Sequence, residues 1–279
     1  MKCNKNHGYG TGACADGNDK FRTDGFPAVN LKIMQDKKAF CFGLDAVLLS
    51  DFAVVKKNEC AVDLGTGSGI IPLILSRISA SVKNETDKFT ALEIQKEQAE
   101  LAKKNVALNN LEDKIKVVEG DIKNVKKLFK PQSFDVVTSN PPYAVFTGGA
   151  VSDDAAASGC EKSNCTVSAK AIARQEILCT LEDVIKAASY ILKPKGRFYM
   201  IHRPERLQQM MTLFSKYNLA SKRIRFVQPF SLKNPTMILI EAVKDADCTA
   251  FVEAPLVIYS EKNIYSDEVA AIYKKLNGR

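Results

Sequence analysis

The sequence predicts an α/β fold with a doubly wound, mostly parallel sheet of seven strands and helices on both faces. Short apolar runs typical of buried strands alternate with longer segments of helical spacing, which is the order that a parallel sheet requires. A turn with three glycines joins the first of these strands to its helix. The composition agrees, because 46% hydrophobic and 26% charged residues over 279 positions are ordinary for a globular chain.

The expected elements begin with a helix from Ala46 to Val55, with Asp45 in the N-cap position. The expected strands are 60–63, 89–93, 115–119, 134–139, 196–201, 223–227 and 236–243. Further helices are expected over 70–78, 95–109 and 169–192. The last of them should stop at Pro194 and Gly196, since both residue types break helices.

Residues 1–30 are expected to form a flexible N-terminal arm, and residues 31–279 a single domain. The start of the chain is rich in Gly, Asn, Asp and Lys without a hydrophobic period, and it lacks the apolar region of a secretory signal. No run approaches the ~18 apolar residues of a membrane span. Eight cysteines without a disulfide framework suit a reducing compartment, so we expect a cytoplasmic protein without membrane contact.

The long loop of small residues over 144–168 holds the closest pair of cysteines that could suggest a metal site, Cys160 and Cys165. Four residues separate them, no second pair follows and the chain has two histidines, so we expect no metal. Because such long loops are functional or disordered, we interpret this one as a lid or substrate loop.

The net charge of +8 is unevenly distributed. Residues 193–244 hold eleven Lys and Arg against two Glu, a net charge of +9 in that segment. Such a segment suggests a polyanionic partner such as nucleic acid, although charge alone fits simple solubility equally well.

Four polar signals fall at the carboxyl ends of the expected strands, where sheets of this kind bind ligands. They are the turn Asp63-Leu64-Gly65-Thr66-Gly67-Ser68-Gly69, the acids Glu93 and Asp121, and the segment Asn140-Pro141-Pro142-Tyr143. The turn lacks both the G-x-G-x-x-G spacing of dinucleotide folds and the Lys of a phosphate loop. Glu93 can accept both hydroxyls of a ribose, and Asp121 an adenine amino group with Ile122 against the ring. This set would suit a ligand with ribose and adenine but no pyrophosphate.

The fourth signal is a stiff corner, because proline fixes its own φ and holds the preceding residue extended. A turn could be made with Gly or Asp, so the corner calls for a functional explanation.

The stretch "DLGTGSG" (63–69) resembles the nucleoside-binding motif of class I S-adenosylmethionine-dependent methyltransferases, and "NPPY" (140–143) resembles the motif of members that methylate amino groups. Three further stretches are similar to the bacterial tRNA1(Val) (adenine-37-N6)-methyltransferase family: "FCFGLDAVLLSDF" (40–52), "KAIARQEI" (170–177) and "GRFYMIHRPERL" (196–207). The resemblance runs from about Leu31 to the C-terminus. The first thirty residues and the insert at 150–168 depart from the family's usual pattern.

The resemblance implies a Rossmann-like fold, S-adenosyl-L-methionine as cofactor, tRNA as the RNA that is bound, and N6-methylation of adenine 37 as the reaction. It implies that Asn140 Oδ1 and the Pro141 carbonyl accept the two amino hydrogens, that Pro142 stiffens the corner, and that Tyr143 stacks on the flipped base. The implied cofactor contacts are Phe42, Asp63, Gly65, Gly67, Gly69, Glu93, Ile94, Asp121 and Ile122.

On the substrate side we expect Arg203, Arg206 and Lys233 to contact RNA phosphates. Three alternatives stay open: methylation of a glutamine amide in a release factor, methylation of rRNA or DNA adenine, and a non-catalytic RNA-binding module. The helical N-terminal domain of the first alternative has no counterpart before residue 40, and the intact motifs argue against the last. The oligomeric state is not fixed by the sequence, and a monomer is slightly favoured.

Overall fold

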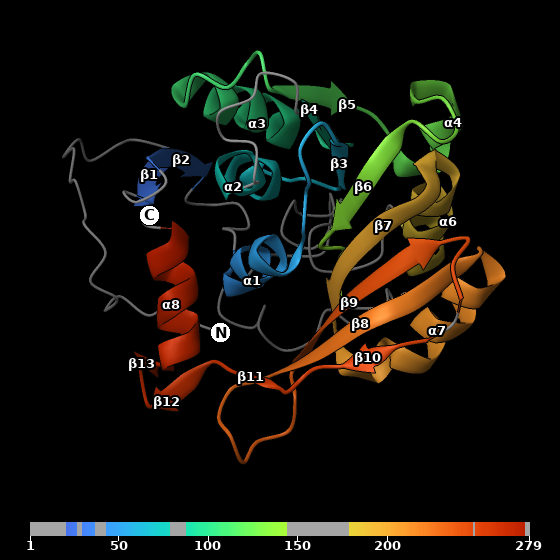
Figure 1. Ribbon diagram of the computed structural model, residues 1–279. Coiled ribbons are helices and arrows are strands. Elements are labelled where there is room, and N and C mark those ends of the chain that lie inside the picture. Colours follow the sequence, from blue (N-terminus) through green and yellow to red (C-terminus); the bar gives the residue numbers. More distant parts are fainter. Residues whose placement is uncertain are drawn as a thin grey trace, which may run out of the picture.

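The computed structural model of the chain describes residues 21–26, 30–36, 43–78, 88–143, 179–247 and 249–276. In this part of the chain a central sheet of nine strands carries helices on both faces (Figure 1). Its strand order is β10-β8-β9-β7-β6-β3-β4-β5, with β11 also paired to β8. All pairings are parallel except those that β9 makes with β7 and β8. The predicted doubly wound, mostly parallel fold is therefore confirmed.

The seven predicted strands are all present. They are β3 (Cys60–Leu64), β4 (Lys88–Glu93), β5 (Ile115–Glu119), β6 (Phe134–Ser139), β7 (Leu192–His202), β8 (Leu219–Gln228) and β9 (Met237–Lys244). Two short strands that were not predicted, β10 (Phe251–Val252) and β11 (Leu256–Val257), extend the sheet beyond β8.

The helices divide into two layers. On one face lie α1 (Leu44–Phe52), α2 (Ile70–Ile78) and α3 (Lys96–Leu108), and on the other α4 (Val125–Leu128), α6 (Leu181–Ile191) and α7 (Leu207–Lys216). Two 3₁₀ turns, η2 (Ile122–Asn124) and η3 (Pro204–Arg206), precede α4 and α7. Each layer buries its own apolar cluster against the sheet. None of the helices in the described part combines the length and apolar character that a membrane span needs.

Helix α6 starts later than the sequence predicts. Thr180 has extended φ and ψ, and its side chain and that of Asp183 form a reciprocal capping box, so the helix begins at Leu181. The predicted helical segment before residue 179 lies outside the described residues. At its other end, strand β7 already begins at Leu192 and includes Pro194 and Gly196, which stood in the sequence as helix breakers.

The N-terminal hairpin consists of β1 (Phe21–Phe26) and β2 (Leu31–Asp36). It docks on α3 because Asn105 and Asn109, one helical turn apart, bind the backbone of β2. Asn109 accepts from the Lys32 N–H at 2.8 Å and donates to the Lys32 carbonyl at 2.7 Å. Asn105 makes the same pair with Met34, at 2.7 and 3.0 Å.

Strand β1 covers one edge of β2, and the two amides bind the backbone N–H and carbonyl groups of Lys32 and Met34 that would otherwise need a second neighbouring strand. Strand β1 thus lies inside the segment 1–30 that was expected to be an arm. The division into an arm and a single domain stays a prediction.

The C-terminal segment folds back on the α1 side. A second hairpin, β12 (Tyr259–Glu261) with β13 (Ile264–Tyr265), leads into α8 (Asp267–Leu276). The rings of Tyr259, Tyr265 and Tyr273 stack in sequence at centroid distances of 5.4 and 5.3 Å. Lys275 then donates to Asp51 of α1 at 2.8 Å, which fastens α8 to the first helix layer.

Candidate active site

The Gly turn after β3 leaves the backbone bare. Gly65, Gly67 and Gly69 have φ of 75°, 57° and 85°, the left-handed region that side chains disfavour. A Cβ on Gly69 would lie 3.3 Å from the Cβ of Ala102, so this glycine lets α3 approach. A Cβ on Gly67 would meet nothing within 4 Å, so that position opens onto space that a ligand can fill.

Asp63, which precedes the turn, holds a carboxylate oxygen without a partner. Its Oδ1 accepts from the Thr138 hydroxyl at 2.7 Å, whereas Oδ2 is buried without a hydrogen bond of normal geometry from the described residues, although the Thr66 hydroxyl is near enough to lower the pKa of Asp63. Burial raises the pKa of Asp63 to about 6. Because buried polar atoms are nearly always satisfied, the orphaned oxygen indicates a place for a ligand or water that donates.

Glu93 ends β4 and is fixed against the turn. Its Oε2 accepts from the Gly67 N–H at 2.8 Å and its Oε1 from the Gln95 N–H at 2.9 Å. Burial raises its pKa, while the hydrogen bonds from the backbone of Gln95 and Gly67 oppose that effect. A carboxylate has about four acceptor positions, so two remain for ligand hydroxyls.

The residues after β5 lie beside the same turn. Asp121 caps η2, and its Oδ1 accepts from the Lys123 N–H at 2.8 Å. The Cδ1 of Ile122 lies 4.0 Å from where a Cβ of Gly65 would stand. Ile94, 37% exposed, follows Glu93 and presents a second apolar surface. The structure thus places Glu93 and Ile122 against the turn, with Ile94 and Asp121 next to them in the chain, whereas Phe42 lies outside the described residues.

The proline corner stands at the neighbouring strand end. Asp63 of β3 pairs with Thr138 of β6, and the Ser139 hydroxyl donates to the Leu64 carbonyl at 2.8 Å, so the two carboxyl ends are tied together. Asn140 and Tyr143 are half-buried and Pro141 is buried. The corner and the Gly turn therefore share one edge of the sheet.

The hydroxyl of Tyr143 joins the corner to α1. Its oxygen lies 2.7 Å from Asp45 Oδ2 and 2.6 Å from Asn140 Oδ1. Burial, followed by the charge of Asp45, raises the pKa of Tyr143 well above its usual range. The N-cap of α1 is Gly43 and not Asp45, which corrects the prediction. Sequence reasoning missed the contact of Asp45 with Tyr143 because an acid before an apolar helix already has a local explanation.

His202 and Arg203 pack on the Tyr143 ring. The His202 ring meets it edge-on at 5.4 Å between centroids, and the Arg203 guanidinium carbon lies 5.4 Å from its centroid. His202 is fully buried, and its Nδ1 accepts from the Arg203 N–H at 2.8 Å. Burial lowers its pKa to about 4, so the imidazole is neutral near pH 7.

The three predicted RNA contacts leave the same edge of the sheet. Arg203 donates to the Thr236 carbonyl at 3.0 Å, and Arg206 donates to Gln209 at 2.6 Å. Lys233 is exposed on the loop between β8 and β9. Arg203 thus lies at the corner itself, as expected from its place after the carboxyl end of a strand.

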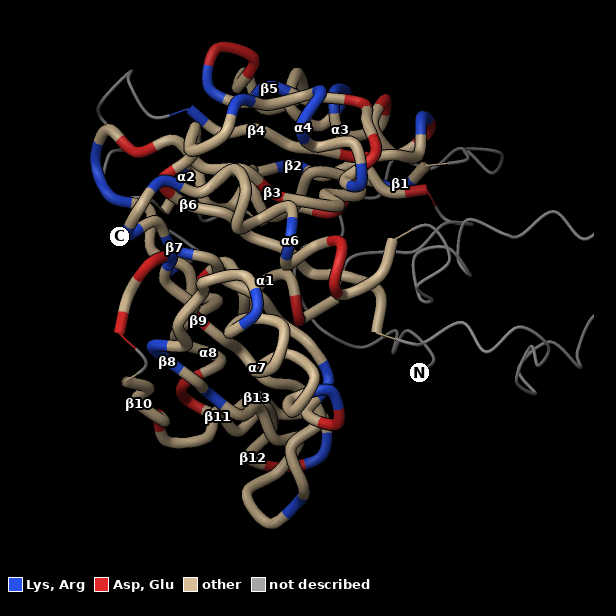
Figure 2. Tube along the Cα trace, turned by 90° about the vertical axis from the view of Figure 1, so that its right-hand side faces the viewer, with Lys and Arg blue, Asp and Glu red and all other residues tan. Residues whose placement is uncertain are grey.

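Much of the remaining basic segment is paired with acids outside it. Arg223 contacts Glu253 at 2.7 Å as well as Glu241 at 3.0 Å, and Arg225 contacts Glu268 at 2.5 Å. Acidic and basic stretches accordingly lie side by side around β8, β10 and β11 (Figure 2). The +9 of residues 193–244 therefore overstates the charge that a partner meets.

Residues 55–243 match the family of methyltransferase domains. The tRNA1(Val) (adenine(37)-N6)-methyltransferase of Bacteroides thetaiotaomicron is 32% identical over 193 residues, covering 68% of this chain and 71% of that protein. The protein of the same name from Porphyromonas gingivalis is 30% identical over 256 residues, covering 88% and 92%.

A solved structure described as a predicted O-methyltransferase from Agrobacterium tumefaciens shares the fold. It has a TM-score of 0.62 and 19% identity, and the match covers 84% of this chain and 98% of that chain. The chain therefore belongs to the tRNA1(Val) (adenine(37)-N6)-methyltransferase family of S-adenosylmethionine-dependent methyltransferases.

Proposed function

We propose that this chain transfers the methyl group of S-adenosylmethionine to N6 of adenine 37 in tRNA1(Val). The observation that carries the proposal is the placement of the Asn140–Tyr143 corner beside the bare Gly turn, on carboxyl ends that are tied together. This juxtaposition supports a reaction between a nucleoside cofactor and an amino group. The choice of adenine 37 in tRNA1(Val) as the substrate rests on the names of the relatives.

The residues around the Gly turn fit the cofactor. Glu93 is held by two backbone donors with acceptor capacity left for ribose hydroxyls, and Gly67 faces open space. Ile94 and Ile122 supply apolar surface for the adenine, and Asp121 an acceptor for its amino group. The orphaned Oδ2 of Asp63 is a further acceptor for a donor of the cofactor or for water. When bound, S-adenosylmethionine supplies a methyl group on a positively charged sulfur.

The corner holds the target amino group. An exocyclic amine is a poor nucleophile while its lone pair is delocalised into the ring. Asn140 Oδ1 and the Pro141 carbonyl accept its two hydrogens, which favours a tetrahedral nitrogen whose lone pair points at the methyl group. Since the prolines fix these acceptors beforehand, little reorganisation is needed.

No strong base takes part in this scheme. The nitrogen forms its bond to carbon as the carbon–sulfur bond breaks, and the proton it then carries is acidic and passes to water. His202, the histidine beside Tyr143, is neutral with a pKa of about 4 and already accepts through Nδ1. It is therefore a poor proton acceptor.

The tRNA is held by phosphate contacts from Arg203, Arg206 and Lys233. An adenine that stacks on Tyr143 takes the place of the Arg203 guanidinium, which now covers that ring. The proposal involves no metal, and it expects a monomer that acts in the cytoplasm.

The test is methyl transfer from isotope-labelled S-adenosylmethionine to total tRNA from a strain that lacks this activity. Mass spectrometry of nucleosides and of mapped fragments should find N6-methyladenosine at position 37 of tRNA1(Val). Parallel reactions contain rRNA, DNA and a release-factor glutamine peptide. Labelling of the peptide alone, or of rRNA or DNA in place of tRNA, would refute the proposed substrate.

A further inference from the structure

Three polar side chains from two distant segments meet at the proline corner. Asp45 of α1 is buried at 9% exposure, and its Oδ1 accepts from the Ala46 N–H at 3.0 Å. Its Oδ2 lies 2.7 Å from the Tyr143 hydroxyl oxygen, which in turn lies 2.6 Å from the Asn140 amide oxygen. The chain of contacts ends at the residue to which the proposed function gives the amino group.

The single hydrogen of the tyrosine hydroxyl cannot serve both neighbours. A carboxylate and an amide oxygen are each acceptors, so only one can receive it. A bond to a charged acceptor is roughly twice as strong as one to a neutral acceptor, so the hydrogen belongs to Asp45. Burial also raises the pKa of Tyr143, so the hydroxyl keeps its hydrogen near neutral pH.

The Tyr143 oxygen can then only accept from Asn140. This requires the NH₂ end of the Asn140 amide to face Tyr143, which a half-turn of the amide achieves without changing the shape of the side chain. In that orientation Oδ1 points the other way and is available to a ligand.

We propose that Asp45 is a positioning residue: by taking the Tyr143 hydrogen, it turns the Asn140 amide so that Oδ1 faces the substrate amino group. This inference rests on the proposed function, because it concerns how that amino group is received. Without Asp45 the hydroxyl donates to Asn140 Oδ1, and the amide NH₂ then faces the substrate NH₂. Two donors would oppose each other, and the acceptor that prepares the lone pair would be lost.

Gly43 provides a second, independent observation. A Cβ at this position would lie 2.6 Å from Asp45 Oδ1 and 3.4 Å from its Cγ. The φ of Gly43 is −104°, which any residue adopts, so the backbone itself does not require glycine. The absent side chain therefore leaves room for the carboxylate in its present place.

The competing explanation is that Asp45 only stabilises α1, as an acid in the first turn does through the helix dipole. A double-mutant cycle separates the two. Asp45→Ala should lower kcat on tRNA by about tenfold or more, the scale of losing one hydrogen bond to the reacting group. In the Tyr143→Phe background, which has no hydroxyl to orient, the same change should alter kcat by less than about twofold.

Two controls accompany the cycle. Asp51→Ala removes another acid of α1, one that pairs with Lys275, and should leave kcat unchanged. Gly43→Ala should displace the carboxylate and reproduce part of the Asp45→Ala loss. Affinity for S-adenosylmethionine, measured by calorimetry, should be unaltered in every variant. Equal losses from Asp45→Ala in both tyrosine backgrounds would overturn the inference.

A readout without catalysis distinguishes this failure from failure of the proposed function. In ¹³Cζ-tyrosine NMR, the Tyr143 resonance is assigned by its absence from Tyr143→Phe. Its titration should move to lower pH in Asp45→Ala, because the facing carboxylate is gone while Arg203 and His202 remain. An unmoved titration would overturn the inference. If the wild type methylates a glutamine amide or rRNA adenine instead of tRNA, the proposed function fails and the cycle is measured on that amino group.

Discussion

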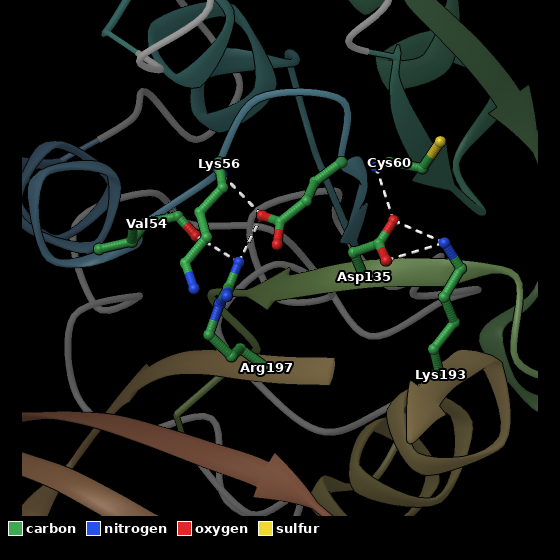
Figure 3. A network of polar contacts seen from close by, with 7 residues as sticks. Val54, Lys56, Cys60, Asp135, Lys193 and Arg197 are labelled. Atoms are coloured by element: carbon green, nitrogen blue, oxygen red, sulfur yellow. Dashed lines mark hydrogen bonds and ion pairs between the residues drawn. The ribbon is translucent and has the colours of Figure 1, made fainter. Parts of the chain in front are cut away.

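The two edges of the central sheet use their polar residues differently. At the amino edge, where β3, β6 and β7 begin, Asp135 accepts from the Cys60 N–H at 2.9 Å and from the Lys193 ammonium at 2.8 Å (Figure 3). Glu59 accepts from the Lys56 N–H at 2.6 Å and pairs with Arg197. Both acids therefore accept hydrogen bonds from groups of the protein itself.

At the carboxyl edge some buried polar atoms have no hydrogen-bond partner among the described residues. Asp63 Oδ2 and His202 Nε2 are buried without a hydrogen-bond partner among the described residues. The Tyr143 hydroxyl has one hydrogen and two polar neighbours within hydrogen-bond distance, Asp45 and Asn140. At the amino edge Arg197 Nε is also buried without a partner among the described residues, but the acids there are satisfied. Because an unsatisfied buried group costs free energy, the acids of the amino edge are suited to holding the strands together, and the unsatisfied Asp63 at the carboxyl edge is suited to binding a ligand. Substitutions at each edge, measured for activity and for stability, test this division.

The largest effect is expected at Asn140. Asn140→Ala should lower kcat by about a hundredfold or more, as the loss of one preorganised polar group does elsewhere. Affinity for S-adenosylmethionine should persist, because the Gly turn and Glu93 are untouched. Single-turnover rates on tRNA and calorimetry with the cofactor measure the two quantities. Wild-type turnover in this variant would remove the corner from the reaction.

The burial of Asp63 without a full set of hydrogen bonds should make the free energy of unfolding depend on pH. Its pKa of about 6 lies above the usual 3.8, so the folded state holds the proton more tightly than the unfolded state. The contribution of Asp63 to stability is therefore fully present below pH ~4 and is lost as pH rises to ~6. The size of the shift corresponds to ~3 kcal/mol.

Unfolding free energies of wild type and Asp63→Asn, which carries no charge, should be compared from pH 4 to 7 without cofactor. The wild type should lose on the order of 3 kcal/mol relative to the variant over this interval. Parallel curves would mean that Asp63 is satisfied in solution, for instance by ordered water.

At the amino edge the expected effect is on stability alone. The Arg197–Glu59 pair is largely shielded, with side-chain exposures of 12% and 18%. Arg197→Met keeps most of the apolar stem but leaves Glu59 without its cation, so it should destabilise the fold by about 2 kcal/mol. Chemical denaturation measures this, and kcat per folded molecule should stay constant. Lys216→Ala, which breaks the exposed pair with Glu182, serves as the control with no measurable change.

The predictable part of the site is the part that strand ends dictate. Parallel strands gather Asp63, Glu93 and Asn140 on one edge, so alternation of strands and helices was enough to bring them together. Asp45 was beyond this reasoning, because its partner Tyr143 is 98 residues away and its position also fits a helix cap.

Two other features were hidden for the same reason. Asn105 and Asn109 read as ordinary polar positions of α3, and their role appears only once the β2 backbone lies against them. The basic segment was judged by the charge within it, whereas Arg223 and Arg225 form ion pairs with Glu253 and Glu268, which lie later in the chain. Long-range pairing of polar groups leaves no local pattern.

The smallest effect is expected from the cations at the carboxyl edge. Arg203 and Arg206 leave the carboxyl end of β7, and Arg203 lies over Tyr143, whereas Lys193 and Lys216 pair with acids elsewhere. If the first pair contacts tRNA phosphates, Arg203→Ala with Arg206→Ala should flatten the slope of log affinity against log salt by about one unit per lost contact. Lys193→Ala with Lys216→Ala removes the same formal charge and should leave the slope unchanged.

Filter binding of tRNA at several salt concentrations gives both slopes, and cofactor affinity should be equal in all three proteins. Equal flattening in the two double variants would mean that net charge alone attracts the tRNA. The carboxyl edge would then bind the adenine at the proline corner without specific contacts to the tRNA phosphates. An unchanged slope in both would leave these arginines as surface charge and would favour a protein amide as the substrate.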